Sequence, residues 1–339
     1  MDFTHTLALS IGSPMVLAFI MGITARLMKS DLRLPEALYS GMTIYLLFAI
    51  GLKGGAKLDG VAWAQFVPVA GCALLLCAAI PVWSFAILCR LGGFSVADAG
   101  ALSAHYGSVS AVTFGAALSF LDAQQIAHEA FLPALLALME GPGILMAFAL
   151  VHLARSSAAR EPAPALGIVS GGGNLLLGKA AAELFTGKGV ILLLGGLAIG
   201  LIGGKAGFEQ VAPLFDAPFK GVLTLFLLEM GLVTGGRLGD LRRSGPFLAV
   251  FAVVMPLLHG ALGVWLGHHA GLGVGGSTVL GTLAASASYI AAPAAVRLAL
   301  PEANPALYLS ASLAVTFPFN VVVGIPLYLG FAKRLAAGG

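Results

Sequence analysis

Two short stretches of small and hydroxyl-bearing residues interrupt long apolar segments of this sequence. The first is residues 107–113 (GSVSAVT), and the second is residues 286–293 (SASYIAAP), which ends in a proline. A proline inside a helix removes one backbone donor and clashes with the preceding turn. We therefore expect the helix that contains Pro293 to bend or unwind, and we expect the two stretches to face each other.

Interrupted helices offer backbone groups that can bind ions. Free amides at the N-terminus of a half-helix suit an anion. Free carbonyls at the C-terminus of a half-helix suit a cation such as sodium, and serine hydroxyls would complete its oxygen shell. The predicted substrate-binding residues are Gly107, Ser108, Val109, Ser110, Ala111, Tyr289, Ile290, Ala291 and Ala292. The predicted cation-binding residues are Thr113, Glu140, Ser286 and Ser288.

Two structural alternatives compete with this interpretation. Small residues let helices pack closely in a membrane, and membrane serines often bond the carbonyl one turn back. One stretch alone favours packing. Two such stretches at corresponding places in the two halves of the chain favour a solute site.

The composition places these stretches in a membrane. Of the 339 residues, 59% are hydrophobic and 10% are charged, whereas a soluble domain has about 25% charged residues. The mean hydropathy is +0.98. So little polar surface cannot cover a globule in water, and the sequence predicts a polytopic membrane protein. The first apolar run lacks a basic leader, so we expect it to be the first span rather than a cleaved signal peptide.

Glu140 lies inside an apolar segment, next to Gly141-Pro142-Gly143. An ionisable residue within a membrane span is costly and indicates a function, so we assign Glu140 to the predicted site. Glu229 also lies within an apolar segment, and we expect it near an interface or paired across helices.

Enzyme and metal chemistry are not indicated. The three cysteines, Cys72, Cys77 and Cys89, fall within one apolar segment and have no metal-ligand spacing. The sequence has no hydrolase, kinase or dinucleotide-binding motif. We predict neither an enzyme nor a cofactor, apart from a coupling sodium ion.

The elements that must position these residues are ten apolar spans, since a span needs about 20 apolar residues. They are predicted near residues 10–28, 35–52, 61–90, 95–120, 129–153, 189–203, 212–234, 245–270, 275–300 and 305–331. A linker rich in Pro and Gly separates the fifth span from the sixth. Within it, residues 174–185 could form a short interfacial helix.

The basic residues orient these spans. Five lie in the loops of one side: Lys53, Lys57, Lys205, Lys333 and Arg334. Twelve lie in the loops of the other: Arg26, Lys29, Arg33, Arg90, Arg155, Arg160, Lys179, Lys188, Arg237, Arg242, Arg243 and Arg297. The more basic side faces the cytoplasm. We therefore expect both termini outside the plasma (inner) membrane and the central linker in the cytoplasm.

An internal repeat relates the two halves. Residues 47–58 (LFAIGLKGGAKL) align with residues 227–238 (LLEMGLVTGGRL) at an offset of 180, and residues 100–104 match residues 281–285 at an offset of 181. The predicted organisation is a first repeat over residues 1–154, a linker over 155–187 and a second repeat over 188–339. Five spans per half give the halves opposite orientations, and inverted repeats with interrupted helices are typical of secondary transporters.

Several motifs in order resemble the sodium-dependent bicarbonate permeases first recognised in cyanobacteria. They are LPEALY at 34–39, IGLKGG at 50–55, GSVS at 107–110, PLLHG at 256–260, ANP at 303–305 and GIPLY at 324–328. The resemblance implies an all-α fold of ten transmembrane helices in a five-plus-five inverted repeat, with two interrupted helices crossing between a core and a gate domain. It also implies a homotrimer, bicarbonate bound between the interrupted helices with sodium nearby, and inhibition from the cytoplasm by a PII-like protein.

Two positions depart from the cyanobacterial pattern. Tyr289 stands where those permeases have an aspartate, and Ala111-Val112 replaces a glycine-serine pair. The sequence therefore resembles a divergent branch of the family. We predict sodium-coupled bicarbonate uptake. Transport of another small organic carboxylate, proton coupling and a membrane receptor or scaffold without transport remain alternatives.

Overall fold

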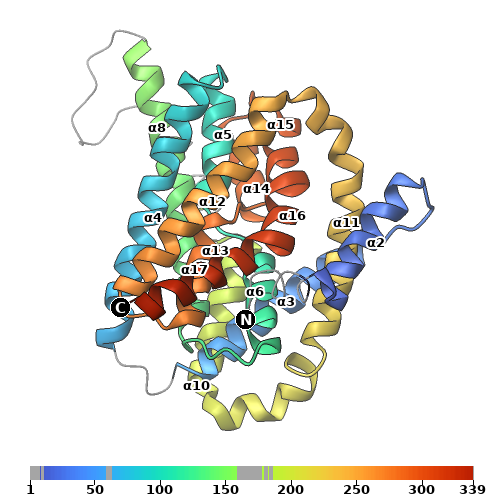
Figure 1. Ribbon diagram of the computed structural model, residues 1–339, viewed down its shortest axis with the longest axis vertical. Helices are drawn as coiled ribbons and strands as arrows, with labels where there is room; N and C mark the ends of the chain where they lie inside the picture. Colours follow the sequence, from blue (N-terminus) through green and yellow to red (C-terminus); the bar gives the residue numbers. More distant parts are fainter. Residues whose placement is uncertain are drawn as a thin grey trace.

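The computed structural model describes residues 11–58, 63–158 and 186–338, together with the single residues 8, 178 and 182. These residues form a helical protein without β-strands (Figure 1). Apart from positions 178 and 182, the interfacial helix predicted at 174–185 lies outside the described residues, as does the linker from residue 159 to 177.

The described helices lie on both sides of the linker. Before the linker they are α2 (Pro14–Leu27), α3 (Glu36–Ala56), α4 (Trp63–Arg90), α5 (Val96–Gly107), α6 (Ala111–Ala123), α7 (Leu132–Met139) and α8 (Pro142–Ala158). After it they are α10 (Lys188–Phe215), α11 (Phe219–Arg243), α12 (Pro246–His269), α13 (Val274–Ala285), α14 (Ala291–Ala299), α15 (Pro305–Leu309), α16 (Phe317–Phe319) and α17 (Ile325–Gly338). Two π-helical turns, η1 (Ser310–Thr316) and η2 (Asn320–Gly324), join α15, α16 and α17 into one rod.

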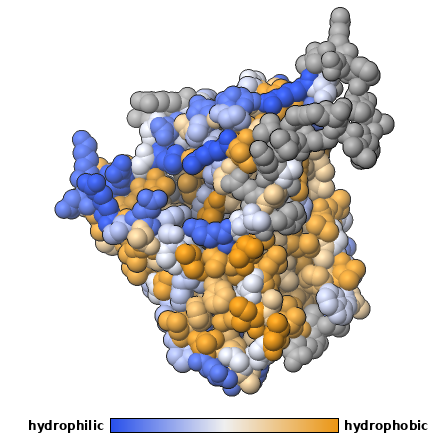
Figure 2. Space-filling view, turned by 180° about the vertical axis from the view of Figure 1, so that it is seen from behind, coloured by the Kyte–Doolittle hydropathy of each residue, from blue (hydrophilic) through white to orange (hydrophobic). Residues whose placement is uncertain are grey.

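Seven helical segments among the described residues are long and apolar enough to cross a membrane. They are α3, α4, α7–α8, α10, α11, α12 and α15–α17. The helices α2 and α13 are apolar but shorter. Apolar residues also gather over a broad part of the face seen in Figure 2, below a more hydrophilic end. The protein is a multi-pass, all-α membrane protein.

The sixth predicted span differs most from the structure. It was expected at residues 189–203, but α10 continues to Phe215, and α11 begins only at Phe219. Gly204 has a φ of +59° and kinks α10, and Pro213 lies inside the helix. Both residue types usually end a helix. The predicted span thus ends where α10 breaks, at Gly204, and what the sequence did not predict is the second helical piece that runs on to Phe215.

The helices pack in two kinds of group. The crossing pairs α2–α11 and α3–α10 make the most extensive contacts. The helices α4, α5 and α8 contact one another, and so do α12, α13 and α17. Figure 1 shows α2 with α11 at one edge of the molecule, and α4, α5, α8, α12, α13 and α17 on the other side.

Glycines allow the crossing pairs to approach closely. A Cβ on Gly22 of α2 would collide with the backbone of α11 at Leu228 and Gly231, and a Cβ on Gly51 of α3 would collide with the carbonyl of Leu193 in α10. These are the small-residue contacts expected of membrane helices. Packing through small residues, considered above for the interrupted stretches, holds these four helices together.

Candidate functional site

The two interrupted helices meet at their breaks. The amide of Ser110, between α5 and α6, donates to Ser286 Oγ at 2.9 Å. The amide of Ser288, between α13 and α14, donates to the carbonyl of His105 at 2.8 Å. The predicted stretches therefore lie against each other, as the sequence led us to expect. Pro293 lies in the first turn of α14, where its missing N–H is tolerated, and the unwound backbone precedes it.

Hydroxyl groups satisfy the first turn of each second half-helix. Ser110 Oγ accepts from the amide of Thr113 at 3.2 Å and from Thr113 Oγ1 at 3.0 Å. Ser288 Oγ accepts from the amide of Ala292 at 3.2 Å. Both α6 and α14 thus begin at the crossing, so their N-termini lie there. Helix N-termini carry partial positive charge, so this arrangement suits an anion.

A small closed chamber lies at the crossing. It is lined by Leu47, Val109, Ser110, Ala111, Glu140, Ser288, Tyr289 and Ile290. Its volume is about 10 Å³, which is the space that one water molecule needs. The chamber is therefore closed to any larger solute in this conformation, and a bound anion requires the surrounding helices to separate.

Glu140 contributes the one carboxylate of the chamber lining. Only 7% of the residue is exposed, and its backbone carbonyl accepts from Ser108 Oγ at 2.7 Å. Carboxylate atom Oε2 has no hydrogen-bond partner. No lysine, arginine or histidine lines the chamber. A buried carboxylate without a partner is costly, so Glu140 is suited to take up a cation or a proton.

The other predicted site residues have structural roles around the chamber. Gly107 packs against Gly143 and Pro81, where a side chain would not fit. Ser286 Oγ donates to the Leu283 carbonyl at 2.8 Å. The lining does not include Gly107, Ser108, Thr113, Ser286, Ala291 or Ala292. The structure brings Val109, Ser110, Ala111, Glu140, Ser288, Tyr289 and Ile290 together.

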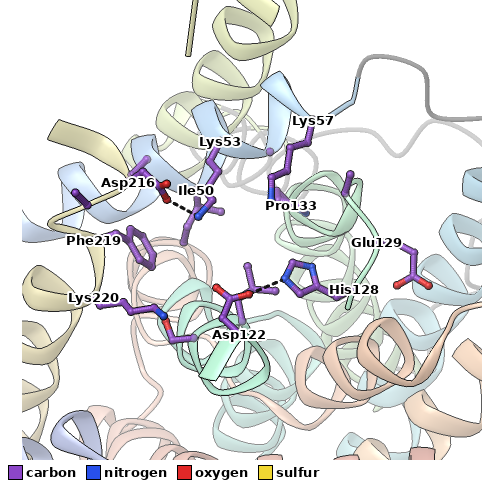
Figure 3. A pocket seen from close by; sticks show the side chains of 16 residues that line it. Ile50, Lys53, Lys57, Asp122, His128, Glu129, Pro133, Asp216, Phe219 and Lys220 are labelled. Atoms are coloured by element: carbon purple, nitrogen blue, oxygen red, sulfur yellow. Dashed lines mark hydrogen bonds and ion pairs between the residues drawn. The ribbon is translucent and has the colours of Figure 1, made fainter. Parts of the chain in front are cut away.

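Further cavities extend from the chamber in two directions. A narrow apolar seam shares the lining residues Leu47, Ala111 and Ile290 with the chamber. The seam also shares Ile50 and Phe219 with a cavity of 390 Å³. We call this cavity the charged vestibule, because its lining includes Lys53, Asp122, Asp216 and Lys220. Figure 3 shows this vestibule. In the other direction, a pocket of 260 Å³ shares Tyr289 with the chamber. We call it the acidic pocket, because Glu36 and Glu229 line it.

Helix α3 follows the whole series of cavities. Its first residue, Glu36, lines the acidic pocket, Leu47 lines the chamber, and Lys53 lines the charged vestibule. At 1.5 Å per residue, Glu36 and Lys53 lie about 25 Å apart along the helix. The chamber thus lies between two wider cavities, which are near opposite ends of α3.

A comparison with protein families identifies the family of this chain. A family model described as the Na⁺-dependent bicarbonate transporter superfamily matches residues 14–333. The chain belongs to this superfamily. No curated protein sequence matches the chain significantly. The protein is therefore a membrane transporter rather than an enzyme, as the sequence predicted, and its family implies an anionic substrate such as bicarbonate.

The sequence did not identify some residues that support the transporter's chamber. Leu47 lines it from α3, and nothing in its local sequence distinguishes it from other leucines. Asn320 is fully buried; its Nδ2 donates to the Ala285 carbonyl at the end of α13 (2.8 Å), and its Oδ1 accepts from the Tyr328 hydroxyl (3.0 Å). A lone asparagine in an apolar span was an available signal for this role.

Proposed function

We propose that this protein is a secondary active transporter that takes up bicarbonate together with sodium through the plasma (inner) membrane. The observation that carries the proposal is the direct contact between two broken helices, whose second halves begin around one chamber with an unpartnered carboxylate. Membership of the Na⁺-dependent bicarbonate transporter superfamily favours this substrate and this coupling ion.

We propose ten crossings, counted by combining the helical segments. The seven long apolar segments supply seven crossings. We add α2, and we count each interrupted pair, α5–α6 and α13–α14, as one more. This arrangement leaves the N- and C-terminal regions on the same side of the membrane, and the distribution of lysine and arginine favours the outside.

The helix contacts support an inverted repeat of two five-crossing halves, with the linker between them. Exchanging the halves turns the pair α2–α11 into α10–α3, and it turns the group α4, α5 and α8 into α12, α13 and α17. Both members of each exchange are in contact. The aligned glycines Gly51 and Gly231 also have equivalent roles, since each packs against the partner helix of its crossing pair.

In the proposed mechanism, the anion binds at the N-termini of α6 and α14, next to Val109, Ser110, Ala111, Tyr289 and Ile290. Glu140 binds the coupling cation, and hydroxyls from Thr113, Ser286 and Ser288 complete its shell when the crossing opens. The chamber would open alternately toward the charged vestibule and the acidic pocket.

The crossing pairs α2–α11 and α3–α10 would serve as the gate, and the two three-helix groups as the core. The homotrimer and the PII-like cytoplasmic partner remain predictions from the family resemblance.

The test is uptake of labelled bicarbonate into proteoliposomes under an inward sodium gradient, an inward proton gradient or no gradient. Sodium-stimulated uptake supports the proposal. Uptake of labelled acetate or another small carboxylate without uptake of bicarbonate would reassign the substrate. The absence of flux for every anion would favour a receptor or scaffold.

One observation favours proton coupling as the second candidate. The Glu140 Oε2 atom has no partner in the closed chamber, and a buried carboxylate in that position is least costly when it is protonated. Stimulation by the proton gradient alone would support this alternative over sodium.

A further inference from the structure

The closed chamber is separated from its two neighbouring cavities by barriers of unequal thickness. Toward the charged vestibule, the chamber first meets the apolar seam, with which it shares Leu47, Ala111 and Ile290. The seam in turn shares Ile50 and Phe219 with the vestibule. Among the described residues, none lines both the chamber and the vestibule. This barrier therefore contains two sets of side chains, one on each side of the seam.

Toward the acidic pocket, the barrier is a single residue. In the part of the chain that the structure describes, Tyr289 alone lines both the chamber and the acidic pocket of 260 Å³. Only 8% of Tyr289 is exposed, so the residue is packed between the two cavities. Displacing this one side chain would join the chamber to the acidic pocket. Displacing one side chain of the seam would leave the chamber separated from the vestibule.

Two further aromatic rings support the ring of Tyr289. Tyr289 contacts Phe317 edge to face, with ring centroids 5.4 Å apart, and Phe317 contacts Phe19 in the same way at 5.6 Å. Aromatic pairs favour this arrangement. Phe19 belongs to α2 of a crossing pair, whereas Phe317 lies in the rod that ends in α17, a member of a three-helix group. The position of the Tyr289 ring therefore depends on how the two packing groups lie against each other.

We infer that Tyr289 is a gating residue: its ring closes the chamber toward the acidic pocket, and a shift of α2 against the rod frees the ring to turn away. That the transported anion passes here rests on the proposed function. In the proposed orientation, the basic residue Arg33 just before α3 places the acidic pocket on the cytoplasmic side. Tyr289 then controls release into the cell. The single-residue barrier can be tested without measuring flux.

The experiment measures how fast a small thiol reagent reaches the chamber. Val109 is buried and lines the chamber, but it lines neither the seam, the vestibule nor the acidic pocket, and Val109→Cys places a thiol there. The partly exposed Cys72 and Cys89 are replaced by alanine, and the buried Cys77 is kept. The purified full chain in detergent is treated with 2-aminoethyl methanethiosulfonate, a cation suited to the acidic pocket. Mass spectrometry of peptides follows modification at position 109.

We expect Tyr289→Ala to raise the rate of modification about tenfold or more, because a buried thiol otherwise reacts only after local opening. Tyr289→Phe keeps the ring and should keep the slow rate. Ile50→Ala is the matched control, since Ile50 is also buried and lies between the seam and the vestibule. It leaves a cavity in the other barrier, but the residues that the chamber shares with the seam still close the chamber. The rate should therefore change by less than about twofold.

A rate that Tyr289→Ala leaves unchanged would overturn the inference. So would an equal acceleration by Ile50→Ala, which would indicate a general loosening of the packing. If Tyr289→Ala does not fold, Tyr289→Leu takes its place, because leucine is shorter and has no ring, and modification severalfold faster than in Tyr289→Phe is the expected result. These rates require neither bicarbonate nor flux, so their outcome is separate from that of the uptake experiment that tests the proposed function.

Discussion

At the scale of single residues, the account depends on Glu140. It is a buried carboxylate at the break between α7 and α8, and it faces a chamber whose lining has no positive side chain. An isolated buried charge costs several kcal/mol, which is more than the packing of one side chain supplies. We therefore regard Glu140 as a functional residue that is retained despite its cost to stability.

Replacing Glu140 by glutamine separates its role in transport from its cost to stability. Glu140→Gln keeps the shape and removes the charge, so we expect thermal stability to be unchanged or raised. We expect the cation-dependent part of bicarbonate uptake to fall about tenfold or more, since an ionisable group within a span is retained for its function. Uptake by the variant with the wild-type cation dependence would contradict the assignment.

Ser110 provides a second test at this scale. Ser110→Ala removes the hydroxyl that accepts from the Thr113 amide, and the loss of such a cap costs about 1 kcal/mol. Because this cap orders the N-terminus of α6 at the chamber, we expect initial uptake to fall severalfold. Leu75→Ala is the control, since Leu75 is 57% exposed and lies away from the chamber. Equal loss of uptake in both variants would favour packing alone.

Residue types predicted part of the site. Serines, small residues and a tyrosine at 107–113 and 286–293 identified Val109, Ser110, Ala111, Ser288, Tyr289 and Ile290, which the structure places around one chamber. Leu47 could not be assigned in this way, because it reaches the chamber from α3 and its local sequence resembles that of other leucines.

At the scale of elements, glycine spacing determines how the crossing helices meet. A Cβ on Gly51 of α3 would overlap the backbone of α10. A Cβ on Gly41, ten residues earlier in the same helix, would meet no atom within 4 Å. The two positions lie on the same helix, so they differ in packing rather than in helix propensity.

The pair gives a matched prediction. Gly51→Ala forces α3 away from α10, and overpacking of this kind costs about 1–3 kcal/mol. Gly41→Ala meets no atom, and its thermal stability should be unchanged or slightly raised because alanine favours the helix. Thermal unfolding of the purified variants in detergent measures both. A Gly51→Ala variant as stable as Gly41→Ala would contradict the close crossing.

Element boundaries show where sequence reasoning reaches its limit. The breaks near Pro142 and Pro293 were located correctly because proline and small residues occur together there. Residues 204–211 lie between two predicted spans, and residues 212–215 were assigned to the start of the next one. In the structure α10 breaks at Gly204, where the earlier span was predicted to end, and a second helical piece that the sequence did not lead us to expect continues to Phe215.

At the scale of the whole molecule, the two packing groups account for transport. Crossing pairs held by glycines form one kind of unit, and two three-helix groups form the other. The closed chamber lies where they meet, between the charged vestibule and the acidic pocket. Interfaces between packed units shift between discrete arrangements more readily than packed cores deform. We therefore expect the units to move relative to each other while each keeps its internal packing.

The most direct test of the central claim is a structure determined by cryo-electron microscopy with saturating bicarbonate and sodium. The account predicts density for an anion between residues 109–111 and 288–290, density for a cation near Glu140, and a chamber wider than the present 10 Å³. Anion density confined to another part of the protein, with the chamber still closed, would contradict it.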